Sequence, residues 1–193
     1  MSELPLFPLQ TVLCPEGRLA LRVFEPRYLD MVARCLRGDN RFGVIAIREG
    51  AEVASTTTTY DVGTSAAIVD WQQESGGLLE IVAAGRTPFR LRATRREPDG
   101  LYVADVDWFE AAPPQPLPAQ HAPLATLLAR LLESLPLYRG VEPALDDAVW
   151  VSSRLIELLP VGLELKQSLL ETEDASQRLE RIAAALKARR EGE

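Results

Sequence analysis

A proline-rich stretch near the middle of the chain separates two parts with different hydrophobic patterns. Five prolines fall between residues 111 and 123, and because proline lacks a backbone N–H, such a stretch favours an extended linker. Before it, apolar residues alternate or form short runs, as in strands; after it, they recur every three or four residues, as in helices. We therefore predict an α+β chain with a β-rich domain at residues 1–112, a linker at 113–122, and a helical domain at 123–193 packed on the first.

The first half of the β-rich part predicts two strands and one helix. Leu19, Leu21 and Val23 occupy alternate positions, which is the period of a half-buried strand. Pro26 then suits the first turn of a helix that ends at Gly38. The apolar run at residues 42–47 has the length of a buried strand.

Two hairpins are predicted in the rest of this part. The strand-like segments 66–71 and 78–83 flank Gly76-Gly77, which permits the positive φ angles of a tight turn. Segments 89–93 and 102–108 flank a Pro-Asp-Gly sequence at residues 98–100. Each pair of segments should therefore be antiparallel.

Three helices are predicted after the prolines, at residues 124–132, 150–159 and 175 onward. The last has the clearest start, because Asp174 and Gln177 have the spacing of a capping box. Leu179, Ile182 and Leu186 form one apolar stripe along it and should be buried.

The charge and cysteine content exclude several classes of protein. The net charge is −7 and the pI is near 4.9, so phosphate backbones and anionic membranes should be poor ligands. The two cysteines, Cys14 and Cys35, are too few for a disulfide framework, and each lies too far in sequence from a second thiol or a histidine to suggest a metal site. The first residues lack the basic start of a secretory signal, and no apolar run is long enough to span a membrane. We expect a cytoplasmic protein that needs neither a metal nor a cofactor.

Common catalytic motifs are missing from the sequence. Lys166 and Lys187 are the only lysines, and leucine precedes each, so there is no phosphate-binding loop. The single histidine, His121, lies among the prolines, where we expect a solvated side chain. Ser168 lies two residues from Lys166, but positions i and i+2 point apart on a helix, so a catalytic dyad is disfavoured. The chain is not expected to be an enzyme.

One long segment and several shorter ones resemble a known family. Residues 4–43 combine Leu-Pro-Leu-Phe-Pro-Leu, a turn at residues 15–17, the sequence Phe24-Glu25-Pro26-Arg27-Tyr28, and Phe42-Gly43. Further matches are Val62-Gly63-Thr64, residues 85–91, and the last helices from residue 163 onward. Together they resemble the amino-terminal, substrate-binding domain of the Lon protease family over nearly the whole chain.

The resemblance implies a fold and a function. It implies a β-rich, PUA-like pseudo-barrel with one helix, followed by a C-terminal helical bundle. It also implies a binding module without catalysis that recognises proteins or peptides, such as the exposed apolar segments of unfolded or tagged substrates. Any effector would be another chain, a separate protease or chaperone. The sequence determines neither the partner nor the oligomeric state.

Two groups of residues are candidates for the binding site. Trp71, Arg86, Phe89 and Arg90 have the side chains that most often anchor protein interfaces, although strand aromatics more often fill cores. The motif at residues 24–28 has mainly structural roles in our interpretation: the two aromatic rings pack on the barrel, Pro26 starts the helix, Glu25 faces its N-terminus, and Arg27 pairs with a nearby carboxylate.

RNA binding is the alternative function. RNA-binding domains occur among PUA-like folds, and four arginines lie close together in the sequence at positions 90, 92, 95 and 96. Such a cluster could contact phosphates locally despite the acidic net charge. A steep salt dependence would distinguish this function from peptide binding.

Overall fold

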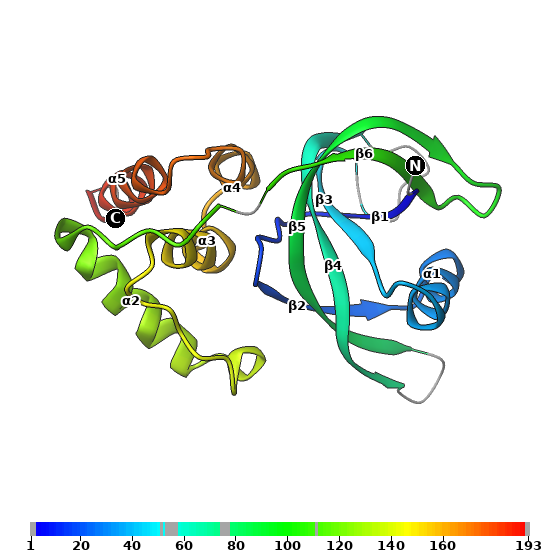
Figure 1. Cartoon of the computed structure of the whole chain (residues 1–193), viewed down its shortest axis with the longest axis horizontal. Helices are drawn as coiled ribbons and strands as arrows, with labels where there is room; N and C mark the ends of the chain where they lie inside the picture. Colours follow the sequence, from blue (N-terminus) through cyan, green and yellow to red (C-terminus); the bar gives the residue numbers. More distant parts are fainter. Residues whose placement is uncertain (1–2, 51, 53–57, 74–77, 111, 192–193) are drawn as a thin grey trace. The chain divides into compact units, whose positions relative to one another are not determined.

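The computed structural model describes residues 3–50, 52, 58–73, 78–110 and 112–191. The chain divides into two compact units, residues 1–111 and 112–193, and each is described by itself. The first contains six strands and α1 (Pro26–Arg37), and the second contains α2 to α5 (Figure 1). The expected α+β fold is confirmed.

Five of the six strands close into a barrel. The strands are β1 (Leu4–Leu9), β2 (Arg18–Val23), β3 (Phe42–Glu49), β4 (Thr58–Gln73), β5 (Leu79–Arg96) and β6 (Tyr102–Trp108). Their order is β2-β5-β4-β3-β1-β6, and β6 also pairs with β5, which closes the barrel. β2 lies outside this closure because it pairs only with the first part of β5.

One expectation about the strands is corrected. The segments at residues 78–83 and 89–93, predicted as separate strands, are parts of the single strand β5. Gly85 allows this strand to continue, since a Cβ there would lie 2.0 Å from the Cys14 carbonyl oxygen. The predicted antiparallel pairing of β4 with β5 is confirmed, whereas the Gly76-Gly77 turn lies outside the described residues.

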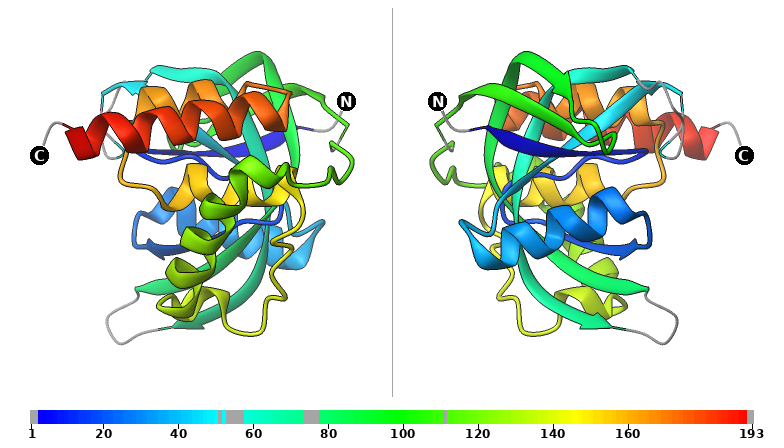
Figure 2. Two further views of the ribbon diagram at one scale, coloured as in Figure 1. Left: turned by 90° about the vertical axis from the view of Figure 1, so that its left-hand side faces the viewer. Right: turned by 90° about the vertical axis from the view of Figure 1, so that its right-hand side faces the viewer.

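α1 covers one face of the sheet (Figure 2). Its buried side chains, Tyr28, Met31, Val32 and Cys35, belong to one hydrophobic cluster with residues of the strands. Partly buried Leu19 and Leu21 of β2 pack against this cluster. The side of the β2–β5–β4 sheet that carries these leucines is therefore the α1 side.

The second unit is built around α3 (Ala148–Leu158), which packs with α2 (Ala122–Glu133), α4 (Leu163–Leu170) and α5 (Ala175–Glu191). The Asp174 half of the capping box predicted for α5 is present, because Asp174 Oδ1 accepts from the backbone N–H groups of Ser176 and Gln177. Leu179 and Ile182 are buried as expected, whereas Leu186 is only partly buried.

The predicted linker makes specific contacts within the second unit. The backbone N–H of Gln115 donates to Asp147 Oδ1 at 2.9 Å, and the N–H of Leu117 donates to the Asp146 carbonyl at 2.8 Å. His121 ends a short 3₁₀ helix, Ala119–His121, and is buried. The expectation of a solvated histidine is wrong, because these contacts hold the segment against the start of α3.

Candidate functional site

The strands β2, β5 and β4 form a three-stranded extension in which β2 is the outer strand. Ala20 is opposite Val82, which is opposite Asp70. Arg22 is likewise opposite Glu80, which is opposite Gln72. Since side chains alternate between the two faces of a sheet, these six lie on one face, opposite the α1 side.

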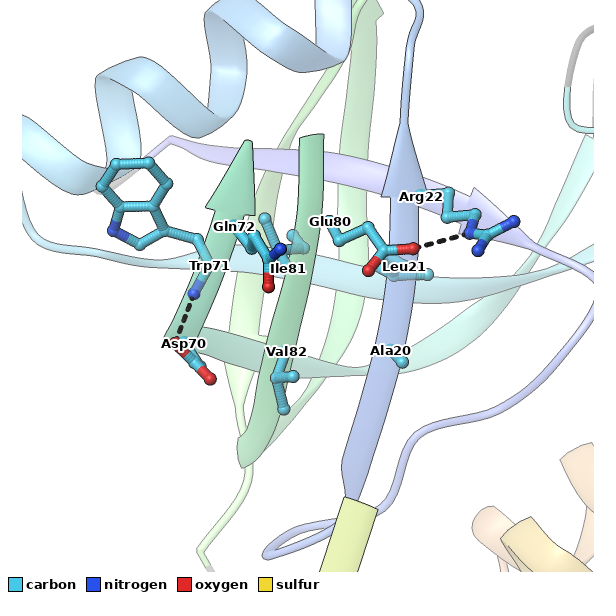
Figure 3. Close-up of a pocket in the computed structure, with 9 residues that line it drawn as sticks. All are labelled: Ala20, Leu21, Arg22, Asp70, Trp71, Gln72, Glu80, Ile81 and Val82. Carbon is cyan, nitrogen blue, oxygen red and sulfur yellow. Dashed lines mark hydrogen bonds and ion pairs between the residues drawn. The ribbon is translucent and has the colours of Figure 1, made fainter. Parts of the chain in front are cut away.

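A shallow hollow of about 430 Å³ lies on this extension (Figure 3). Its lining comprises three residues from each strand: Ala20, Leu21, Arg22, Asp70, Trp71, Gln72, Glu80, Ile81 and Val82. Arg22 Nε lies 2.8 Å from Glu80 Oε1, and the two side chains are 72% and 36% exposed. An ion pair this exposed contributes little free energy, so either side chain can turn to a ligand.

Trp71 is exposed, as a binding anchor requires, although an aromatic residue in a strand more often fills a core. It pairs with Ile81, whose side chain is buried on the α1 side, and its ring points away from Gln72 and Val82 (Figure 3). The residue is 54% exposed. Its side chain therefore lies on the other face of the sheet from the side chains of Gln72 and Val82.

Phe89 cannot be an exposed anchor, so this part of the predicted site is wrong. It is fully buried in a cluster with Leu4, Leu6, Ile45 and Ala104. Its ring also lies against Gly43 and Gly63, two glycines in the segments that resemble the Lon family. A Cβ added to Gly43 would lie 2.9 Å from Phe89 Cζ, and a Cβ added to Gly63 would lie 2.8 Å from it. Phe89 is instead a core residue.

The predicted arginines do not gather around Trp71. Arg86 and Arg90 are both exposed on β5, but Arg90 lies nine residues beyond Ile81, which is about 30 Å of strand. The Arg90 guanidinium instead lies over the Phe109 ring at 5.5 Å. The structure therefore brings no single site together from these residues.

The other arginines of the suggested RNA-binding cluster contact groups of the protein itself. Arg92 Nε lies 3.2 Å from Asp107 Oδ2, and Arg95 Nη2 lies 2.9 Å from Glu3 Oε2. Arg96 Nε donates to the Gly100 carbonyl at 3.3 Å. Nearby carboxylates thus offset much of the positive charge of this cluster.

Three residues of the motif at positions 24–28 fasten α1 to the barrel. Arg27 Nη2 lies 2.7 Å from Glu25 Oε2, while Arg27 Nη1 donates to the Gly100 carbonyl at 3.2 Å. Tyr28 stacks on Phe7 with ring centroids 4.0 Å apart. Burial raises the pKa of the Tyr28 hydroxyl to about 12, so it remains protonated at neutral pH.

Phe24 departs from the expected structural role, while Pro26 begins α1 as expected. Phe24 is 61% exposed in the connection between β2 and α1. The expectation that it packs on the barrel is wrong, because the chain turns after Val23 and leaves the ring outside. No Glu25 side-chain hydrogen bond caps the helix; the carboxylate pairs with Arg27 instead.

The chemically reactive groups have structural contacts. Lys166 Nζ donates to the Glu157 carbonyl and Ser168 Oγ to the Leu165 carbonyl, both within the helical unit. Burial raises the pKa of the Cys35 thiol to about 11. Among the described residues, no group of three or more His, Cys, Asp or Glu side chains could hold a metal ion. Nor does the described part of the chain contain a helix long and apolar enough to cross a membrane.

The fold places the chain in a class of small barrel domains with a helical extension, and comparison with known proteins gives its family. The model of the ATP-dependent protease La (LON) substrate-binding domain matches residues 3–188, so the chain belongs to that family. A Lon N-terminal domain protein from Xanthomonas campestris is 38% identical, with a TM-score of 0.78 over 95% of this chain and 98% of that one.

Two more distant relatives extend the comparison. The N-terminal domain of a Mycobacterium avium complex Lon protease has a TM-score of 0.63 at 15% identity, over 94% of this chain and 96% of that one, and shows the fold alone. Protein cereblon of Xenopus tropicalis is 30% identical over 109 residues, or 54% of this chain. The match covers only 23% of cereblon.

Proposed function

We propose that this chain is a non-catalytic module that binds exposed apolar segments of unfolded or tagged proteins and presents them to a separate protease or chaperone. Membership of a family of substrate-binding domains supports recognition of protein substrates. The observation that carries the proposal is the β2–β5–β4 extension, which lies beside the closed barrel and has an open hollow on one face. Exposed Trp71 is a second proposed contact on the other face.

Peptide binding fits this surface better than RNA binding does. Ala20 and Val82 are apolar residues that line the hollow, and the charged residues that line it are one arginine, Arg22, and two carboxylates, Asp70 and Glu80. Carboxylates repel phosphate, and the arginines at 92 and 95 already pair with acidic side chains. A polypeptide, by contrast, can combine apolar contacts with either sign of charge.

Calorimetric titration with an unfolded model protein such as casein tests this function. Burial of apolar area should give a negative heat-capacity change and an affinity that depends weakly on salt. RNA binding would instead weaken by roughly 10³-fold between 50 and 200 mM salt for six or more phosphate contacts, and that outcome would favour RNA as the ligand.

A matched pair of variants locates the surface. Ala20→Gln places a longer polar side chain at the hollow, whereas Ala93→Gln makes the same change at an exposed position of β5 outside it. The first should weaken binding by about 1 kcal/mol, and the second should leave it unchanged. Equal affinities for the two variants would exclude the hollow as the binding surface.

A further inference from the structure

The three-stranded extension has two free edges. The β3–β4 pairing ends at Phe42 and Ala66, so no described strand lies beside the last residues of β4 on that side. On the opposite side, β5 is the only partner of β2 among the strands that the structure describes. A free edge offers unpaired N–H and C=O groups to which an extended polypeptide can bind.

The register shows which backbone groups of β2 face outward. Gly85 N–H donates to the Gly17 carbonyl at 2.9 Å, so the Gly17 C=O faces β5, although the Gly17 N–H donates to the Cys14 carbonyl at 3.1 Å. Because neighbouring residues of a strand point their backbone groups in opposite directions, Leu19 and Leu21 also face β5. The N–H and C=O groups of Ala20 and Arg22 therefore face away from the sheet.

Side chains of the protein already occupy the β4 edge. Asn40 Nδ2 donates to the Ile68 carbonyl at 2.8 Å, and Asn40 Oδ1 accepts from the Ile68 N–H at 3.2 Å. The N–H of Trp71 donates to Asp70 Oδ1 at 2.9 Å. These contacts satisfy three of the outward groups on this edge, namely the N–H and C=O of Ile68 and the N–H of Trp71.

The β2 edge differs from the β4 edge in this respect. Ala20 and Arg22 are exposed, and outside the strand pairings no backbone acceptor among the described residues binds their N–H groups. We propose that the edge of β2 binds an extended polypeptide segment as an added strand. This inference rests on the proposed function and specifies its binding mode and its substrate class.

The side chains of β2 indicate the chemistry of the bound segment. Arg18 and Arg22 lie on the face of the hollow with Ala20 between them, whereas Leu19 and Leu21 lie on the α1 side, partly buried against the core. An added strand that alternates acidic and apolar residues would place carboxylates beside Arg18 and beside Arg22, whose exposed pair with Glu80 leaves it able to turn to a ligand. Its apolar side chains would lie on the α1 side of the sheet and pack beside Leu19 and Leu21.

The same charges disfavour pairing of β2 with a second copy of itself. An antiparallel pair centred on Ala20 would set Arg18 of each copy opposite Arg22 of the other. Like charges directly opposite one another destabilise a pair of strands. The arginines therefore favour a different, acidic segment as the occupant.

Modified peptides test the binding mode. The probe is a fluorescent peptide of about eight residues that alternates glutamate and leucine, and its binding is followed by fluorescence anisotropy. An added strand bonds to β2 through every second residue only. N-methylation of one alternate set of residues should therefore lower affinity about tenfold or more, while N-methylation of the other set leaves it nearly unchanged. Equal effects of the two sets, or no binding of the parent peptide, would overturn the proposal.

Variants of the chain test the edge itself. Ala20→Pro removes an outward N–H without removing a hydrogen bond to β5, and should weaken peptide binding about tenfold while the urea midpoint changes little. Replacing both Arg18 and Arg22 by Glu should reverse the preference, so that a lysine–leucine peptide binds more tightly than the glutamate–leucine peptide.

Amide hydrogen exchange keeps the test decisive even if Ala20→Pro does not fold. In the wild-type chain the peptide should slow exchange of the Ala20 and Arg22 amides, whereas those of Leu19 and Leu21 are protected in both states. Unchanged exchange at Ala20 and Arg22 in the bound state would refute strand addition. If folded Ala20→Pro binds casein as the wild type does, strand addition fails and the proposed function stands; if casein does not bind the wild type at all, the proposed function fails.

Discussion

The contact of Phe89 with two glycines gives a sharp prediction about stability. A Cβ on Gly63 would lie 2.4 Å from the Val44 carbonyl oxygen and 2.8 Å from Phe89 Cζ. The carbonyl belongs to paired strands and cannot move away freely, because Val44 and Gly63 lie in the β3–β4 ladder. Gly63→Ala should therefore lower the free energy of unfolding by about 3 kcal/mol, which corresponds to a fall in Tm of roughly 10 °C.

A comparison with Gly43 separates the two sources of strain. At Gly43 the three atoms nearest to an added Cβ all belong to side chains, including Phe89 Cζ at 2.9 Å. In a Phe89→Leu background, Gly43→Ala should consequently recover part of its lost stability, whereas Gly63→Ala should not, because the carbonyl remains in place. Gly162→Ala is the control, since nothing lies within 4 Å of the added Cβ.

Urea denaturation followed by circular dichroism measures all of these variants. A wild-type midpoint for Gly63→Ala would show that the Val44 carbonyl does not obstruct the added methyl group. Equal rescue of Gly63→Ala and Gly43→Ala by Phe89→Leu would show the same.

Three other predictions concern the site, the alkaline limit of stability and the helical unit. Trp71→Ala should weaken casein binding by about 1–3 kcal/mol if the ring is an anchor. Its Tm should change little, because Trp71 is exposed. Casein binding equal to that of the wild type would show that Trp71 is not part of the site. The pKa values of Cys35 and Tyr28 are raised in the folded chain, so the unfolded chain releases these two protons at a lower pH than the folded chain does. The free energy of unfolding should therefore fall as pH rises above about 9. Tyr28→Phe should flatten this fall between pH 10 and about 12, which urea midpoints across that range would show. Leu179→Ala should cost about 2–5 kcal/mol, and Leu186→Ala less because Leu186 is only partly buried; equal urea midpoints would contradict the assigned burial.

The sequence alone was sufficient for features that depend on neighbouring residues. The start of α1 at Pro26 and the Asp174 cap of α5 depend on backbone groups within one turn of helix. Alternation along β2 likewise follows from the geometry of a single strand. These local signals, together with the family motifs, predicted the α+β fold and the order of its parts.

Tertiary structure decided which residues are accessible. Phe89 and Phe24 have the same side chain, but β1, β3 and β6 enclose Phe89, whereas Phe24 follows the end of β2 and remains exposed. Strands distant in sequence determine this difference, so no local pattern contains it.

The free edge of β2 likewise depends on pairings between distant segments. β5 continues past Gly85 to close the barrel with β6, and this closure leaves β2 with one neighbour. The alternation of Arg18, Ala20 and Arg22 was visible in the sequence, but only the register showed that their backbone groups face outward. A strand's own residues determine its two faces, whereas its edges are determined by the strands that pair with it.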